Sequence, residues 1–373
     1  MKAPFRVVQV CCILSLGIIE SLQAEDASID KLLSKLPPPE KIIQPSARKA
    51  LEQADPAFKD SLTEQIVVDV RTGNFSHALG LSRKLTEQYP RSSGAQALRG
   101  ALAYDLRQYG EASTAFRAAT NLDSKYPFAY FGLAAVEATQ GHYAAAIPYL
   151  QQVLKLQPNA AAAYYVLSDC SFYLGHKEES ASYARKGTSL APSDGDMWLQ
   201  LARAEKSLGH TDATLNAIAK AAEVSPNSGL MLAVLGFSYI NLNRIPQAIP
   251  PLERAAKLLP HNYLVQSQLG YCLMTVGQTN AAIDHLRTGA SLNSNYGPVW
   301  EHLGVALQKR GRHRDAVDPL EKATRLMPTS RYAWKHLAEA YQATGRAADA
   351  QHAAARAQQL GGGAIATVSK KKN

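Results

Sequence analysis

The sequence has few cysteines and few charged side chains, and its apolar runs are short. Four cysteines in 373 residues are too few for a disulfide framework. Charged residues make up 19% of the chain, below the roughly 25% of average soluble domains. Hydrophobic residues make up 46%, which excludes an intrinsically disordered chain. No apolar run reaches the about 20 residues that a membrane-spanning helix needs. These absences leave a folded chain that is rich in small apolar residues.

Motifs that carry catalytic chemistry are also missing. The sequence has no Gly-x-x-x-x-Gly-Lys-Ser/Thr phosphate loop, no His-Glu-x-x-His metal helix and no Gly-x-Ser-x-Gly nucleophile turn. Its 10 histidines are scattered along the chain. We therefore expect a protein that is not an enzyme and that has no cofactor and no metal site.

The first residues have the organisation of an export signal. Lys2 and Arg6 lie beside a mostly apolar stretch at residues 7–19, and Ala24 then provides a small residue for cleavage. We expect cleavage after Ala24 and an exported mature chain, either periplasmic or secreted. A lipid-modified Cys11 is the alternative, although the residue before it is a valine and not the small residue typical of lipoprotein signals.

A period of 34 residues runs through the rest of the chain. Proline, glycine, alanine and leucine each recur at their own slot of this period, and such self-similarity is the signature of a repeat architecture. The proline slot holds Pro90, Pro158, Pro192, Pro226, Pro260 and Pro328. The glycine slot holds Gly73, Gly141, Gly175, Gly209, Gly277, Gly311 and Gly345, with Arg107 and Asn243 as exceptions. The alanine slot holds Ala78, Ala112, Ala146, Ala248, Ala282, Ala316 and Ala350, and the leucine slot holds Leu133, Leu167, Leu201, Leu235, Leu269, Leu303 and Leu337.

The residue at each of these slots has a physical role in a pair of helices. Apolar residues at spacings of three and four, such as Trp300, Leu303 and Leu307, form one face of a helix. Gly311 supplies the left-handed residue that ends this helix, and Pro328 ends a second helix. The small alanines allow the two helices to approach closely. Each unit is therefore predicted to be an antiparallel helix pair.

These residues resemble the tetratricopeptide repeat, and Trp300, Leu303, Gly304, Ala316 and Pro328 carry the resemblance most clearly. The resemblance covers nearly the whole chain after the leader. It implies an all-α fold, a right-handed α-solenoid of stacked antiparallel helix pairs. We expect a signal peptide at 1–24, a linker with capping helices at 25–58, a solenoid at 59–362 and a flexible basic tail at 363–373. The solenoid would hold about nine repeats, the first two of them degenerate.

The resemblance also implies a binding surface. In the family, the concave face comes from the second, fifth, ninth, twelfth and thirteenth residues of each unit. Here these positions form a trough that is mostly aromatic and aliphatic: Tyr104, Phe128, Phe131, Tyr165, Asp169, Phe172, Tyr173, Leu199, Arg203, Lys206, Phe237, Ile240, Asn241, Tyr271 and Met274. Rigid rings on an exposed groove are typical binding anchors. A second set of rings occupies the packing slot of the repeat and is expected to belong to the core: Tyr130, Tyr164, Trp198, Trp300 and Trp334.

These patterns predict a non-enzymatic scaffold that binds protein or peptide segments with apolar or aromatic anchors. Two alternatives stay open: an accessory or assembly factor of a bacterial envelope, secretion or polysaccharide-export complex, and a regulatory subunit of an enzyme. No nucleic-acid partner is expected, because the chain has an export signal and no known nucleic-acid module. A homodimer through the alanine-rich last helix is a further alternative.

Positive charge gathers near the C-terminus. Residues 296–373 hold 13 basic and 6 acidic residues, and Arg310, Arg312, His313 and Arg314 crowd one turn. A solvated loop explains this charge, and a peripheral contact with an anionic surface is the functional alternative.

The two cysteines beyond the leader occupy the same slot of the repeat. Cys170 and Cys272 are three periods apart, and a disulfide requires Cα atoms within about 7 Å. We expect two buried thiols in place of an internal bridge, with a disulfide between two molecules as the alternative.

Overall fold

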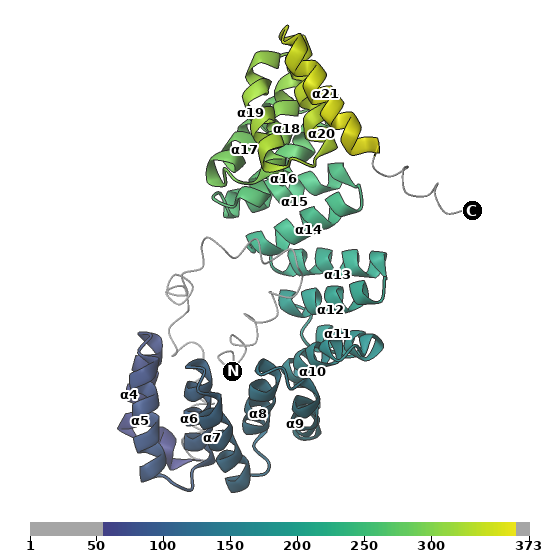
Figure 1. Ribbon diagram of the computed structural model, residues 1–373. Helices are drawn as coiled ribbons and strands as arrows, with labels where there is room; N and C mark the ends of the chain where they lie inside the picture. Colours follow the sequence, from purple (N-terminus) through teal and green to yellow (C-terminus); the bar gives the residue numbers. More distant parts are fainter. Residues whose placement is uncertain (1–54, 363–373) are drawn as a thin grey trace, which may run out of the picture. The chain divides into compact units, whose positions relative to one another are not determined.

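The computed structural model describes residues 55–362, and every regular element in that range is a helix (Figure 1). The expected all-α class is therefore confirmed. A short 3-10 helix, η3 (Pro56–Lys59), comes first. The α-helices that follow are α4 (Ser61–Arg71), α5 (Phe75–Gln88), α6 (Ser93–Asp105), α7 (Tyr109–Leu122), α8 (Pro127–Thr139), α9 (Tyr143–Leu156), α10 (Ala161–Tyr173), α11 (Lys177–Leu190), α12 (Gly195–Ser207), α13 (Thr211–Val224), α14 (Gly229–Asn241), α15 (Ile245–Leu258), α16 (Tyr263–Thr275), α17 (Thr279–Leu292), α18 (Gly297–Lys309), α19 (His313–Leu326), α20 (Arg331–Ala343) and α21 (Ala347–Gly362). The predicted signal peptide, most of the linker and the basic tail lie outside the described residues.

The chain divides into two compact units, Met1–Val224 and Ser225–Asn373. In the described part, the first unit holds η3 to α13 and the second holds α14 to α21. Within each unit the helices form successive pairs, from α4 with α5 to α20 with α21, and each helix contacts mainly the next one or two along the chain. Such nearest-neighbour stacking defines a repeat solenoid. The first helices of neighbouring pairs also touch, as α10 and α12 do.

The turn inside each pair is closed by one left-handed residue. All seven glycines of the predicted row have positive φ, and Gly277 has the largest value at 87°. The two exceptions in the row adopt the same conformation, with φ of 59° at Arg107 and 55° at Asn243. The turn geometry therefore belongs to the repeat, and glycine is the residue that adopts it without a steric penalty.

Small residues set the distance between the helices of a pair. Ala282 and Ala316 are fully buried, and Ser180 is fully buried at the equivalent place in α11. On the facing first helix, a side chain added at Gly304 would meet Leu320, and one added at Gly270 would meet Leu286. The predicted close approach of the two helices is confirmed.

The tryptophans of the packing slot are tied to the preceding turn. The Nε1 of Trp198 donates to the carbonyl oxygen of Pro192 at 2.8 Å. Trp334 donates in the same way to Pro328 at 3.0 Å, and Trp300 donates to Ser294 at 3.0 Å. These half-buried rings therefore connect α12, α18 and α20 to the end of the pair before each of them.

Candidate binding surface

The two units divide the predicted trough residues between them. The first unit carries those from Tyr104 to Lys206, on α6, α8, α10 and α12. The second unit carries those from Phe237 to Met274, on α14 and α16. Each set is therefore a surface of its own unit.

Residues of α9, α10 and α12 converge in the first unit. Arg203 of α12 forms an ion pair with Asp169 of α10, from Nη2 to Oδ1. Its guanidinium carbon lies 4.4 Å from the centre of the Phe172 ring and 5.6 Å from that of Tyr173. Tyr173 in turn stacks on Tyr143 of α9, with ring centres 4.6 Å apart and planes 8° from parallel. We call these five residues the Arg203 cluster.

Burial differs strongly within the Arg203 cluster. Arg203 is 4% exposed, whereas Tyr173 is 44% exposed. A buried guanidinium is costly unless a carboxylate compensates its charge, and Asp169 supplies that carboxylate. Arg203 also holds the aromatic rings through cation–π contact. The cluster is therefore a fixed base that presents the face and edge of Tyr173 to solvent, with exposed Lys206 on the same helix as Arg203.

Several other trough residues of the first unit are packed into its core. Tyr104, Tyr165 and Leu199 are between 6% and 7% exposed. The hydroxyl of Tyr104 lies 2.6 Å from Oγ1 of Thr139. Phe128 makes an edge contact with Phe116, with ring centres 6.2 Å apart. At these positions neighbouring helices cover the face that the first helix presents. Phe131 and Phe172 are half-buried.

In the second unit, two of the five trough residues are buried. Phe237 is 7% and Met274 is 6% exposed, while Ile240 is half-buried and Asn241 is exposed. The ring of Tyr271 lies 4.8 Å from that of His302 of α18.

The imidazole beside Tyr271 is held neutral. Burial lowers the pKa of His302 to about 4, and neighbouring His336 adds a smaller repulsion. Neutral His302 therefore packs as a ring and carries no charge at neutral pH.

Reactive chemistry is not favoured at the two thiols. Cys170 and Cys272 are free and fully buried, as the sequence predicts. Burial raises the pKa of each thiol to about 12, so both stay protonated and poorly nucleophilic near neutral pH.

Residues 55–362 contain no cluster of three or more potential metal ligands. None of the helices described combines the length and apolar character needed to cross a membrane.

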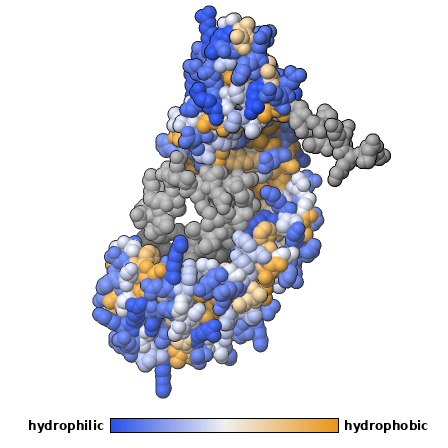
Figure 2. Space-filling view, in the orientation of Figure 1, coloured by the Kyte–Doolittle hydropathy of each residue, from blue (hydrophilic) through white to orange (hydrophobic). Residues whose placement is uncertain are grey.

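Exposed apolar side chains also occur outside the predicted trough. Figure 2 shows apolar and polar residues interspersed over both units. Val68 and Tyr332, neither of them in the predicted trough, are 53% and 67% exposed. Exposed apolar area alone therefore does not locate a site, and the Arg203 cluster stands out by its fixed geometry.

Sequence reasoning missed three contributors to these surfaces. Tyr143 begins a second helix, and the family positions are all on first helices. His302 lies between the positions that the family uses. Thr139 does occupy such a position, but its small side chain gave no sign of the hydrogen bond to Tyr104. Only Thr139 could have been found from the period alone.

One family model matches part of this chain. Residues 131–195 match the tetratricopeptide repeat family, and no curated protein matches the chain. The crystal structure of MamA is 24% identical, covers 43% of this chain and 94% of its own, and has a TM-score of 0.40. The Cut9–Hcn1 hetero-tetramer of the APC/C is 17% identical over 76% of this chain and 57% of its own, at 0.42. YrrB, a TPR protein described as having an unusual peptide-binding site, is 18% identical over 59% and 96%, at 0.34.

The matched segment runs from α8 to the start of α12 and contains the predicted trough residues of α10. The described chain is thus an all-α repeat solenoid, and its residues 131–195 match the model of the tetratricopeptide repeat. Repeats of this family are in general non-catalytic and mediate interactions between proteins. The solved structures are similar in sequence only at a low level, so they carry no argument about partners.

Proposed function

We propose that this chain is a non-enzymatic scaffold that binds segments of partner proteins on the face formed by its first helices. The observation that supports this proposal is the Arg203 cluster, in which the ion pair of Arg203 and Asp169 and the rings of Phe172 and Tyr143 hold exposed Tyr173 in place. Binding then requires no covalent step. A partner segment gains contact area on a ring whose orientation is already fixed.

The energetic advantage lies in this fixed geometry. Tyrosine buries a large area and loses little rotamer freedom on binding. Stacking on Tyr143 and edge contact with Phe172 at 5.6 Å have already restricted the Tyr173 side chain. Preorganisation of this kind reduces the entropic cost of association. The preferred partner segment has an apolar or aromatic anchor for the ring, and exposed Lys206 favours a neighbouring acidic group.

A single exposed ring tests the proposal. Tyr173→Ala should remove captured partners from an envelope or secreted fraction, because it deletes the exposed ring and leaves the buried pair of Arg203 and Asp169 in place. Tyr332→Ala is the matched control, because Tyr332 is also exposed and lies on α20 of the other unit. Both variants should keep the wild-type helical circular dichroism. Retention of every partner by folded Tyr173→Ala would refute the assignment of this surface.

We further propose that the chain is exported and works in the periplasm or outside the cell. The charged, apolar and small residues of 1–24 support this proposal. Mass spectrometry of the chain purified from its native source should find a mature N-terminus at Glu25. An intact Met1, or a lipid on Cys11, would contradict cleavage after Ala24.

A further inference from the structure

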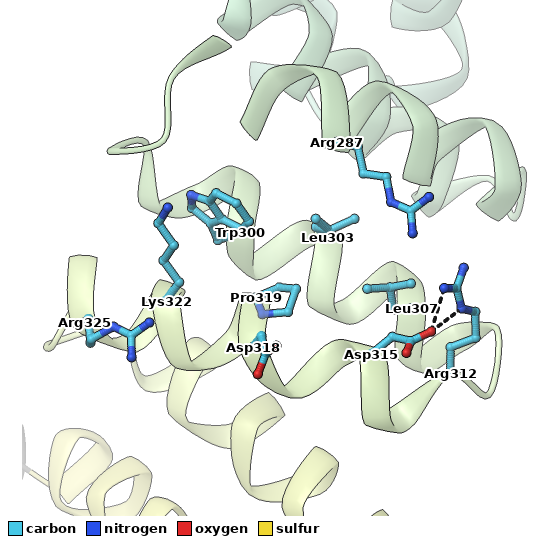
Figure 3. A pocket seen from close by; sticks show the side chains of 10 residues that line it. All are labelled: Arg287, Trp300, Leu303, Leu307, Arg312, Asp315, Asp318, Pro319, Lys322 and Arg325. Atoms are coloured by element: carbon cyan, nitrogen blue, oxygen red, sulfur yellow. Dashed lines mark hydrogen bonds and ion pairs between the residues drawn. The ribbon is translucent and has the colours of Figure 1, made fainter. Parts of the chain in front are cut away.

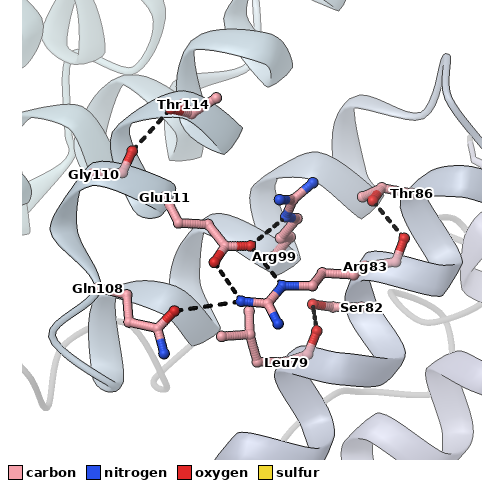
Figure 4. Close-up of polar contacts among 9 residues, drawn as sticks. All are labelled: Leu79, Ser82, Arg83, Thr86, Arg99, Gln108, Gly110, Glu111 and Thr114. Atoms are coloured by element: carbon pink, nitrogen blue, oxygen red, sulfur yellow. Dashed lines mark hydrogen bonds and ion pairs between the residues drawn. The ribbon is translucent and has the colours of Figure 1, made fainter.

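Charged side chains of second helices pair with residues of the next helix pair in the first unit. Arg83 of α5 reaches across to Glu111 of α7, with Nε at 2.9 Å from Oε1 and Nη2 at 2.6 Å from Oε2 (Figure 4). Arg99 of α6 adds a third bond to the same carboxylate, at 2.8 Å. A bidentate arginine–carboxylate pair is among the strongest polar contacts in proteins. Glu111 therefore satisfies Arg83 from within the chain.

The same position of the repeat is paired in two other repeats, but not at Arg117, one period after Arg83, which has no ion pair within residues 55–362. Arg185 lies three periods after Arg83, and its Nε and Nη2 both donate to Oε1 of Glu205, at 2.9 and 2.6 Å. In the last of these repeats the charges are reversed. Glu321 takes this position, accepts from the hydroxyl of Tyr341 at 2.8 Å and pairs with Arg346 at 3.3 Å.

Arg287 of α17 occupies this position in the groove between α17 and α19. Within residues 55–362 it has no hydrogen bond and no ion pair, and it is exposed. Asp315 is the repeat counterpart of Glu111, but its Oδ2 is taken by Nε of Arg312 at 2.6 Å. Leu307 stands where Glu205 stands in the other unit. The described chain therefore supplies no carboxylate to Arg287.

This groove forms a pocket of about 500 Å³. Figure 3 shows Arg287 on one side and Arg312 on the other, both directed toward the space between the two helices, with Leu303 and Leu307 beside them. Asp318 points away from Arg287 in the same view. Lys322 and Arg325 add positive charge at the far end, where the Lys322 ammonium lies 4.1 Å from the centre of the Trp300 ring.

We propose that this pocket binds an acidic peptide segment of a partner protein. A glutamate or aspartate carboxylate of the segment takes the place at Arg287 that Glu111 takes at Arg83. The lining has more cationic than carboxylate side chains, which favours further acidic residues in the bound segment. The methylene groups of these acidic residues can pack on Leu303 and Trp300. The pocket lies between second helices, so the inference is independent of the surface proposed above.

The proposal is tested by binding of a fluorescent, N-acetylated and C-amidated hexaglutamate peptide to the full chain at low salt. Arg287→Glu should weaken the affinity at least about tenfold, because it removes the cation that pairs with the carboxylate and adds a repelling charge. This variant should also fold well, since its new carboxylate can pair with Arg312 as Glu321 pairs with Arg346. An unchanged or raised Tm therefore separates lost binding from lost structure.

Arg314→Glu is the control. Arg314 is exposed, lies two residues after Arg312, and does not line the pocket. It makes the same change in net charge and should weaken binding less than about twofold, as a screened surface charge does. Equal losses in the two variants would show general attraction to a basic surface and overturn the proposal.

The chemical source of the anion is tested with further probes. A hexaglutamine peptide should not bind, and inorganic phosphate at millimolar concentration should compete only weakly. Binding of vesicles containing phosphatidylserine that Arg287→Glu abolishes, without binding of hexaglutamate, would assign the pocket to a membrane surface and overturn the proposal. Tight binding of phosphate alone would overturn it as well.

Discussion

Glu111 links two helix pairs in the first unit, because it accepts two bonds from Arg83 of the preceding pair. Hydrogen bonds from Arg83, opposed by burial and assisted by Arg99, lower the pKa of Glu111 to about 2. The ordinary pKa is 4.5, so the folded state favours the carboxylate. The resulting stability is fully present above about pH 4.5 and declines as the pH falls toward the folded pKa.

We expect Glu111→Gln to lower the free energy of unfolding by about 1 to 3 kcal/mol at pH 7, because the bonds from two arginines lose their charged acceptor. The difference from wild type should shrink as the pH falls below about 4.5, where the native carboxylate loses its advantage. Urea unfolding at several pH values measures this difference. Glu87→Gln is the control, since Glu87 is exposed on α5 and has no ion pair within residues 55–362. A pH-independent effect of Glu111→Gln would contradict the role given to its charge.

Within an element, the contact between two helices of a pair depends on a residue without a side chain. Gly304 of α18 faces Leu320 of α19 so closely that an added methyl group would overlap the leucine side chain. Leu320 is fully buried and has little space into which to move. Gly304→Ala should therefore destabilise the second unit by about 1 to 3 kcal/mol, although alanine is the better helix former.

The matched control is Gly80→Ala in α5, where an added methyl group would meet nothing within 4 Å. This substitution should stabilise its helix by about 0.5 to 1 kcal/mol. Thermal unfolding should show a lower Tm for Gly304→Ala and a higher Tm for Gly80→Ala than for wild type. If both substitutions were stabilising, the close approach at Gly304 would not limit the packing of the pair.

The elements also show what could be predicted from the sequence. The periodic prolines and glycines predicted the helix pairs, because they mark positions where a backbone must turn. Exposure was harder to predict: Tyr165 and Tyr173 are both in the predicted trough, yet they are 6% and 44% exposed. A repeat position fixes the face of a helix, but the neighbouring pair decides what covers it.

The pocket at Arg287 has one feature that the sequence predicts and one that it does not. The period places Arg287 with Arg83 and Arg185, so its position could be predicted. Asp315 pairs with Arg312 and not with Arg287. The reasons are that the aspartate side chain is shorter than glutamate and that Arg312 is nearby. Such a choice between partners is made in three dimensions, and the sequence pattern does not contain it.

At the scale of the whole molecule, contacts within each unit join helices that are neighbours along the chain. In such an array the effect of a lost contact should spread to adjacent pairs and fade with distance. Leu286 of α17 is fully buried, and Leu286→Ala should cost about 2 to 5 kcal/mol locally because it leaves a cavity. Hydrogen exchange should accelerate in α16 to α18 and stay unchanged in α4 to α9.

Leu150→Ala gives the reciprocal test, because Leu150 of α9 is also fully buried and lies in the other unit. Its effect should concentrate in α8 to α10 and leave α16 to α21 as in wild type. Together the two variants distinguish local from global unfolding, since each serves as the control for the other. If either substitution accelerated exchange equally in both units, the array would unfold as one cooperative block, and the binding surfaces of the two units could not respond independently to their partners.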